Sequence, residues 1–76
     1  MNKEKYQVIK FNGEDDECLM EFDNIDEAVA AAKCIARSNK MNPCQTYHSD
    51  VILQYCKMEG SRVADGVGVI RTVKTE

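Results

Sequence analysis

The chain has 76 residues, of which 43% are hydrophobic and 30% are charged, and its formal net charge is −3. This size and composition predict a single globular domain over residues 1–76 with a small core, and they argue against a disordered chain or a deep enclosed active site. No apolar run reaches the roughly 18 residues of a membrane span, and the N-terminus lacks the apolar stretch of a signal peptide. We therefore expect a cytoplasmic protein that makes no membrane contact.

Two strands are predicted first, over residues 5–11 and 18–22. The first segment is rich in β-branched and aromatic residues, and the second alternates in polarity. Asn12-Gly13, between them, is a strong signal for a two-residue hairpin turn. The two segments are therefore expected to form an antiparallel hairpin.

The register of this hairpin depends on the length of its loop. A two-residue turn would pair Phe11 with Glu14 and would place acidic residues beside apolar ones on one face. A loop over residues 12–17 pairs Phe11 with Cys18 instead. Because the buried face sets the register, we favour the longer loop, which makes the acidic residues project from the hairpin tip.

A helix is predicted next, because Asn24 followed by Glu27 has the form of a capping box and five alanines lie between residues 28 and 36. Ser38-Asn39 and then Pro43 are expected to end it. Apolar residues at helical spacing predict one buried stripe. Its members are Ile25, Ala28, Val29, Ala32, Ile35 and Ala36, and the opposite face carries Asp26, Ala30, Lys33, Arg37 and Lys40.

The segment over residues 40–50 is long for a helix-to-strand connection and contains the only Pro and the only His of the chain. Loops on a rigid scaffold often carry recognition residues. Tyr47 is amphipathic and suits an interface better than a core. We consider a contact loop with Tyr47 and His48 in the interface, and a plain connection as the alternative.

Two further strands are predicted over residues 51–58 and 62–73, joined by a turn at Gly60-Ser61. Two apolar faces favour a central position for the first of them. A two-residue turn pairs Tyr55 with Gly66 and Leu53 with Gly68, so that large side chains cover glycines.

A second turn at Asp65-Gly66 is the alternative, and it would divide the last strand in two. The predicted fold class is α+β with the order ββαββ. One amphipathic helix packs on one face of a mostly antiparallel four-stranded sheet.

The distribution of charge is the most informative feature of the sequence. Residues 14–27 hold eight of the 13 acidic residues and no Lys or Arg. The rest of the chain carries ten basic and five acidic residues, so a segment of −8 stands beside a remainder of +5. Such a surface can steer and orient a basic partner, whereas helix capping and solubility are the plainer explanation.

The four cysteines, Cys18, Cys34, Cys44 and Cys56, contain no CxxC pair. In a reducing compartment they are expected to remain thiols, with a disulfide or a metal site as alternatives. The spacing of Cys44 and His48 would suit a nucleophilic pair or two zinc ligands, but neighbouring partners for either role are missing. We therefore predict no enzyme, no cofactor and no metal.

A nucleic-acid-binding module is the alternative, because Lys33, Arg37 and Lys40 form a basic stripe on the outer helix face. Aromatic residues on strands can stack bases, and Tyr6, Phe11 and Tyr55 lie on predicted strands. The negative net charge argues against direct nucleic-acid binding, because phosphate contacts dominate affinity. A self-associating protein that pairs an exposed edge strand in a homodimer is a further alternative.

The size, the acidic segment and the helix entered by FDNIDEAVAAAKCIA (residues 22–36) are similar to those of small phage and mobile-element proteins, including some anti-CRISPR proteins. The resemblance implies a protein that acts stoichiometrically by docking a charged surface onto a larger complex. It assigns no role to any residue. We expect a non-enzymatic protein that binds a basic protein surface. The candidate residues are Glu14, Asp15, Asp16, Glu17, Glu21, Asp23, Tyr47 and His48.

Overall fold

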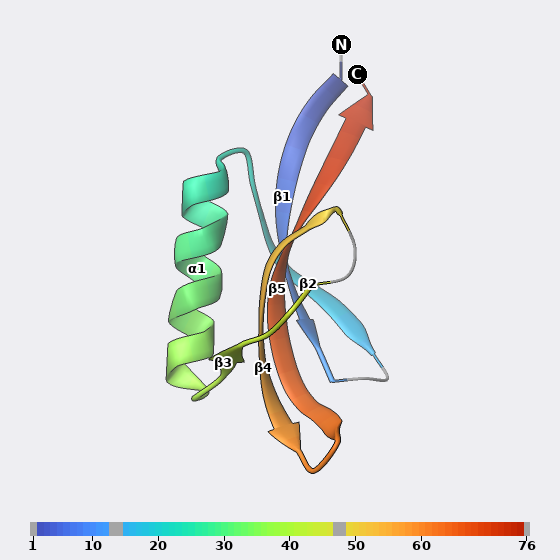
Figure 1. The fold of residues 1–76 in the computed structure, drawn as a ribbon. Helices are drawn as coiled ribbons and strands as arrows, with labels where there is room; N and C mark the ends of the chain where they lie inside the picture. The colour runs from blue at the N-terminus through green and yellow to red at the C-terminus, as the bar shows by residue number, and fades with distance from the viewer. Residues whose placement is uncertain (1, 13–14, 47–48, 76) are drawn as a thin grey trace.

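The computed structural model describes residues 2–12, 15–46 and 49–75, which form one helix and one antiparallel five-stranded sheet (Figure 1). The sheet order is β2-β1-β5-β4-β3, so β5 is the middle strand. The molecule is elongated, with extents of 45 × 21 × 18 Å. The elements are β1 (Asn2–Phe11), β2 (Asp16–Phe22), α1 (Ile25–Ser38), β3 (Asn42–Pro43), β4 (Val51–Glu59) and β5 (Arg62–Thr75).

The helix forms where the sequence predicts it, and both of its ends are capped. The Asn24 side chain accepts hydrogen bonds from the backbone N–H groups of Asp26 (2.7 Å) and Glu27 (3.4 Å). These bonds satisfy two of the donors that a helix N-terminus leaves free. Asn39 caps the other end. In the described ranges, no helix combines the length and the apolar character that crossing a membrane requires.

The core lies between α1 and one face of the sheet. The predicted stripe is confirmed, because Ala28, Ala32 and Ala36 are buried while the residues predicted on the opposite helix face are exposed. Three small side chains let the helix backbone approach the sheet closely, and this contact stabilises the fold by removing apolar surface from water. The other members of the core are Val8, Met41, Val67 and Val69.

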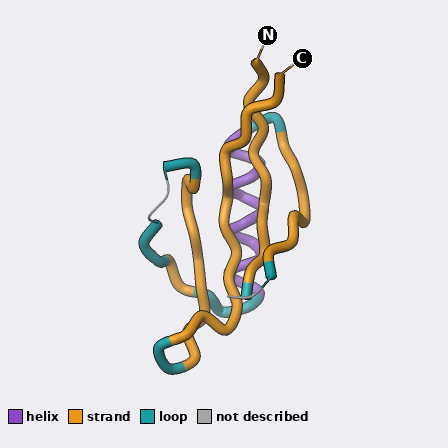
Figure 2. Tube along the Cα trace, turned by 90° about the vertical axis from the view of Figure 1, so that its right-hand side faces the viewer, coloured by secondary structure: helices purple, strands orange, loops and turns teal. Residues whose placement is uncertain are grey.

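No described segment covers the opposite face of the sheet, which we call the open face. Figure 2 looks onto it, with α1 behind the sheet. Alternation along the strands places Ile9, Phe11, Ile70 and the two strand glycines there, because Val8, Val67 and Val69 point toward the helix. The sheet is therefore half covered, as is common for antiparallel sheets.

The α+β class is confirmed, but the predicted four strands and the order ββαββ are incomplete. Asn42–Pro43 forms β3, whose residues pair with Cys56 and Tyr55 of β4, so the order is ββαβββ. The predicted connection is thus partly bound to the sheet. A strand of two residues that includes Pro is too short to show an alternation of apolar and polar residues. The sequence therefore does not reveal it.

The register predicted for the first hairpin is also wrong. Phe11 pairs with Asp16 and Ile9 with Cys18, so the loop is shorter than residues 12–17. The register shifts between Val8 and Ile9, with the result that Val8 pairs with Met20. A bulge therefore restores the apolar pairing deeper in the sheet, and this makes the shorter loop compatible with the buried face.

The second hairpin turns at Gly60-Ser61 as predicted, with Glu59 paired to Arg62. A register shift between Lys57 and Met58 then moves Tyr55 opposite Val67, so the predicted pairing of Tyr55 with Gly66 is wrong.

The same shift pairs Leu53 with Val69 rather than with Gly68. The last strand runs unbroken through Asp65-Gly66, which excludes the alternative turn there. β4 is an interior strand, as expected for residues 51–58, because it pairs with β5 on one side and with β3 on the other, while β5 is the middle strand.

Candidate functional site

Three acidic residues lie where the first hairpin turns and enters β2. Asp15, Asp16 and Glu17, which we call the acidic tip, are all exposed. Two hydrogen bonds close the loop beside them: the Asp15 N–H donates to Asn12 Oδ1 (2.9 Å), and the Asn12 N–H donates to the Asp15 carbonyl (3.3 Å). Within the described ranges, no ion pair neutralises the three carboxylates.

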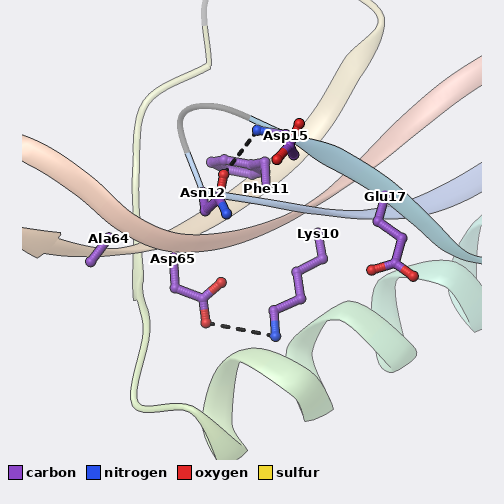
Figure 3. A pocket seen from close by; sticks show the side chains of 7 residues that line it. All are labelled: Lys10, Phe11, Asn12, Asp15, Glu17, Ala64 and Asp65. Atoms are coloured by element: carbon purple, nitrogen blue, oxygen red, sulfur yellow. Dashed lines mark hydrogen bonds and ion pairs between the residues drawn. The ribbon is translucent and has the colours of Figure 1, made fainter.

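The acidic tip places carboxylates on both faces of the sheet at its outer edge. Asp16 is paired with Phe11, whose ring lies on the open face, and Glu17 is paired with Lys10 on the side of the helix. Figure 3 shows Lys10 directed toward Asp65, with a Nζ–Oδ2 distance of 3.9 Å, and Glu17 on the same side of the sheet. Lys10, Glu17 and Asp65 border an open hollow of about 330 Å³. A shallow, solvated surface of this kind suits docking better than chemistry.

Two further predicted acidic residues, Glu21 and Asp23, do not belong to the tip. Glu21 accepts a hydrogen bond from Gln7 Nε2 (2.9 Å), and Asp23 forms an ion pair with Lys5. The hydrogen bond and the charge of Lys5 lower the pKa of Asp23. Asp23 also lies beyond the far end of β2, about 20 Å from Asp16 at the usual rise per strand residue. The predicted acidic site therefore divides into a tip without an ion pair in the described ranges and a far end with local partners.

The remaining predicted contact residues, Glu14, Tyr47 and His48, lie outside the described residues. The predicted Cys44–His48 pairing thus stays a prediction. Among the residues that the structure describes, no group of three or more His, Cys, Asp or Glu side chains could hold a metal ion. The acidic tip is therefore no part of such a metal-binding group among the described residues.

The basic stripe on α1 is exposed, as the sequence predicts for Lys33, Arg37 and Lys40. Lys33 and Arg37 line an open hollow of about 390 Å³ together with Met41 and Tyr55. Lys40 lies beyond the helix in a left-handed conformation (φ 57°), and its N–H donates to the Arg37 carbonyl. Lys33 and Arg37 therefore share a hollow with an aromatic side chain.

The aromatic residues considered for base stacking do not form one platform. Tyr6 and Tyr55 pack against the core beneath the helix, whereas the ring of Phe11 lies on the open face. The sequence places all three on strands but cannot tell which face the helix covers. The aromatic surface that a base-stacking sheet needs is thus divided between two faces.

The open face is a surface that the sequence reasoning missed. Ile9, Phe11, Val51 and Ile70 line a hollow of about 230 Å³ above Gly68. The sequence signal that could have revealed it is the spacing of Ile9 and Phe11, two apolar residues that lie two positions apart on one strand. Residues at this spacing point to the same face of a sheet. A single helix cannot cover both faces, so the apolar row on the open face stays half-buried.

Comparison of the chain with protein-family models, with curated proteins and with solved structures gave no match in any of the three.

Proposed function

We propose that this protein is a non-enzymatic binding protein that docks the acidic tip onto the basic surface of a protein partner. The observation that carries the proposal is that Asp15, Asp16 and Glu17 are exposed and have no ion-pair partner in the described ranges. Uncompensated charge at one end of a molecule raises the rate of encounter with a surface of opposite charge and orients it.

The fold supports docking at this position in a second way. β2 is an outer strand of the sheet, and no described strand pairs with its outer edge. A partner can therefore reach the carboxylates from the edge and from both faces. The groove in which a nucleic-acid-handling complex holds phosphates has the complementary charge, and an inhibitor of such a complex is the specific role that we propose.

The test is a pair of charge-reversal variants with equal changes in net charge. Asp16→Lys with Glu17→Lys removes two carboxylates of the tip, and Asp50→Lys with Glu59→Lys removes two exposed carboxylates elsewhere. Partners captured from a native lysate by the unmodified protein should be lost with the tip variant and retained with the control variant. Mass spectrometry of the captured proteins and circular dichroism of the variants provide the readouts.

Equal capture by the tip variant would contradict the proposal, provided that its circular dichroism is unchanged. Equal loss with the control variant would contradict it as well, because net charge rather than the tip would then control binding. In both cases the partner, once identified, can be titrated directly against the two variants.

A nucleic-acid-binding role is the second candidate, favoured by the hollow that Lys33 and Arg37 share with Tyr55. This role predicts a gel shift with short RNA or DNA that weakens steeply as salt is raised. Binding of the protein displaces cations from the phosphates, and added salt opposes that release. Lys33→Glu with Arg37→Glu should abolish that shift. A shift that survives in this variant, or no shift at low salt, contradicts this candidate.

Self-association through the free edge of β2 is a third candidate, and it predicts a dimer in light scattering. The strand carries two features that oppose edge-to-edge pairing: exposed carboxylates and a bulge. It therefore ranks below docking of the acidic tip.

A further inference from the structure

Two cysteines that are far apart in the sequence lie beside each other on the open face, where β3 meets β4. Asn42 is paired with Cys56, and the Cys44 N–H donates to the Gln54 carbonyl at 3.0 Å, which continues the same register. Asn42 and Cys44 are two residues apart, as are Gln54 and Cys56. Cys44 and Cys56 are therefore diagonal neighbours on one face of an antiparallel pair.

The side chains around this pair form a small cluster rich in sulfur. Gln54 Nε2 donates a hydrogen bond to Cys44 Sγ (3.2 Å), and Cys56 Sγ lies 4.0 Å from Met58 Sδ. Cys56 is buried, with 7% of its surface exposed, whereas Cys44 is half-buried. Burial and then the neighbouring Cys44 raise the pKa of the Cys56 thiol to about 11.

The spacing is within reach of a disulfide after a small movement. Diagonal partners in an antiparallel pair have Cα atoms about 7–8 Å apart, whereas a disulfide requires about 4.4–6.8 Å. Cys44 follows a strand of only two residues at the outer edge of the sheet, so its backbone is held there by few hydrogen bonds. The remaining approach can be made by this edge segment while β4 stays in place.

We propose that Cys44 and Cys56 form a redox site that closes to an intramolecular disulfide by exchange with a low-molecular-weight disulfide such as oxidised glutathione. This inference is independent of the proposed function of the acidic tip. Cys44 is the attacking residue, because it is less buried than Cys56 and lies at the outer edge of the sheet. Cys56 is the resolving residue, because burial keeps it protonated and away from solvent.

The chemistry proceeds in two exchanges. The Cys44 thiolate attacks one sulfur of oxidised glutathione, which breaks the S–S bond and releases one glutathione as thiolate. Cys56 then loses its proton and attacks Cys44 Sγ, which releases the second glutathione. Two protein thiols are oxidised to one disulfide, one glutathione disulfide is reduced to two thiols, and the two protons from the protein end on these thiols.

The Cys44–Cys56 disulfide would link the segment after β3 covalently to β4. Cys18 and Cys34, which are both exposed, lie on β2 and α1 and take no part in the cluster. They serve as internal controls, because as accessible thiols without a resolving neighbour they should form mixed disulfides with glutathione.

The test is thiol mapping of the purified, unmodified protein after equilibration with reduced and oxidised glutathione, acid quenching and alkylation. We expect a crosslinked peptide that joins Cys44 to Cys56, with the loss of two hydrogens, and glutathione adducts at Cys18 and Cys34. Cys56→Ser should convert the crosslink into a stable adduct at Cys44. A variant with Cys18→Ser and Cys34→Ser should retain the crosslink in full.

Three results would overturn the inference. These are a stable glutathione adduct at Cys44 in the unmodified protein, free Cys44 and Cys56 thiols under conditions that modify Cys34, and crosslinks that involve Cys18 or Cys34 as often as the proposed pair. Because the decisive mapping uses the unmodified protein, a Cys56→Ser variant that fails to fold does not affect the outcome.

Discussion

The contact between Phe11 and Gly66 lies on the open face, next to the turn of the first hairpin. The Phe11 ring lies directly over Gly66, and a Cβ atom at that position would come within 2.3 Å of the ring carbons Cε2 and Cζ. Gly66 is therefore required for close approach of an aromatic ring to the sheet, not for an unusual backbone angle. The sequence predicts that a large side chain covers this glycine, but it assigns the role to Tyr55 on the wrong neighbouring strand.

Gly66→Ala should destabilise the protein, because the added methyl group displaces the Phe11 ring. We expect a loss of about 1–3 kcal/mol from overpacking, partly offset by the roughly 0.4–1 kcal/mol that alanine contributes by restricting the unfolded chain. Urea unfolding of Gly66→Ala, Phe11→Ala and the double variant measures the coupling between the two sites. If Gly66→Ala is equally costly with and without the Phe11 ring, the proposed clash is wrong.

Among the elements, the helix depends on alanines that no larger residue can replace. Ala28, Ala32 and Ala36 lie against the sheet with at most 2% of their surface exposed, whereas Ala30 on the same helix is exposed. The distance between the two layers is thus set by methyl groups.

Ala32→Leu should cost about 1–3 kcal/mol or more, because three added carbon atoms have no space between helix and sheet. Ala30→Leu is the matched control, and it should change the stability by less than about 0.5 kcal/mol because it lies on the outer face. Thermal unfolding followed by circular dichroism measures both. Equal effects of the two substitutions would contradict the close packing of the layers.

The sequence predicts the elements more reliably than it predicts their registers. The helix and its cap follow from local signals, Asn24 and the alanine spacing, and these signals act within a few residues. Strand registers depend on bulges, and a single extra residue, as at Leu19 beside the Val8/Ile9 shift, changes every pairing beyond it. Local pattern therefore predicts the existence of the hairpins but not the partner of Phe11.

The candidate site was predictable to a similar degree. Exposure of Asp15, Asp16 and Glu17 follows from their position at a hairpin tip, and the structure agrees. The neutralisation of Asp23 depends on Lys5, 18 residues away in the sequence, and no local pattern reports such a contact. The proximity of Cys44 and Cys56 likewise depends on β3, which the sequence does not reveal.

At the scale of the whole molecule, the two ends of β1 carry different features. Residues 2–5 and 72–75 extend beyond β2 and β4 as a two-stranded ribbon, which we call the terminal arm, and the acidic tip lies toward the opposite end of β1 (Figure 1). The Lys5–Asp23 ion pair and a hydrogen bond from Thr72 Oγ1 to the Lys5 carbonyl (3.3 Å) hold the base of this arm.

The ion pair at the arm predicts a dependence of stability on pH. Because Lys5 lowers the folded-state pKa of Asp23 below its ordinary value of 3.8, the contribution of the pair is complete above pH 3.8 and is lost as the pH falls below it. Asp23→Asn should therefore lower the melting temperature at neutral pH but not well below pH 3.8. Asp50→Asn, which alters an exposed carboxylate, is the control and should show no such pattern. A deficit of Asp23→Asn that persists in acid would contradict the assignment.

The pairing of Asn2 with Thr75 brings the two ends of the described chain to the same place, at the far end of the terminal arm (Figure 1). An affinity handle or fluorophore attached at either end therefore points away from the acidic tip. Immobilised in this way, the protein presents its carboxylates outward, some tens of ångströms from the support at the usual rise of β1. The protein can consequently be immobilised by either end for partner capture. The choice of end should leave the set of captured partners unchanged.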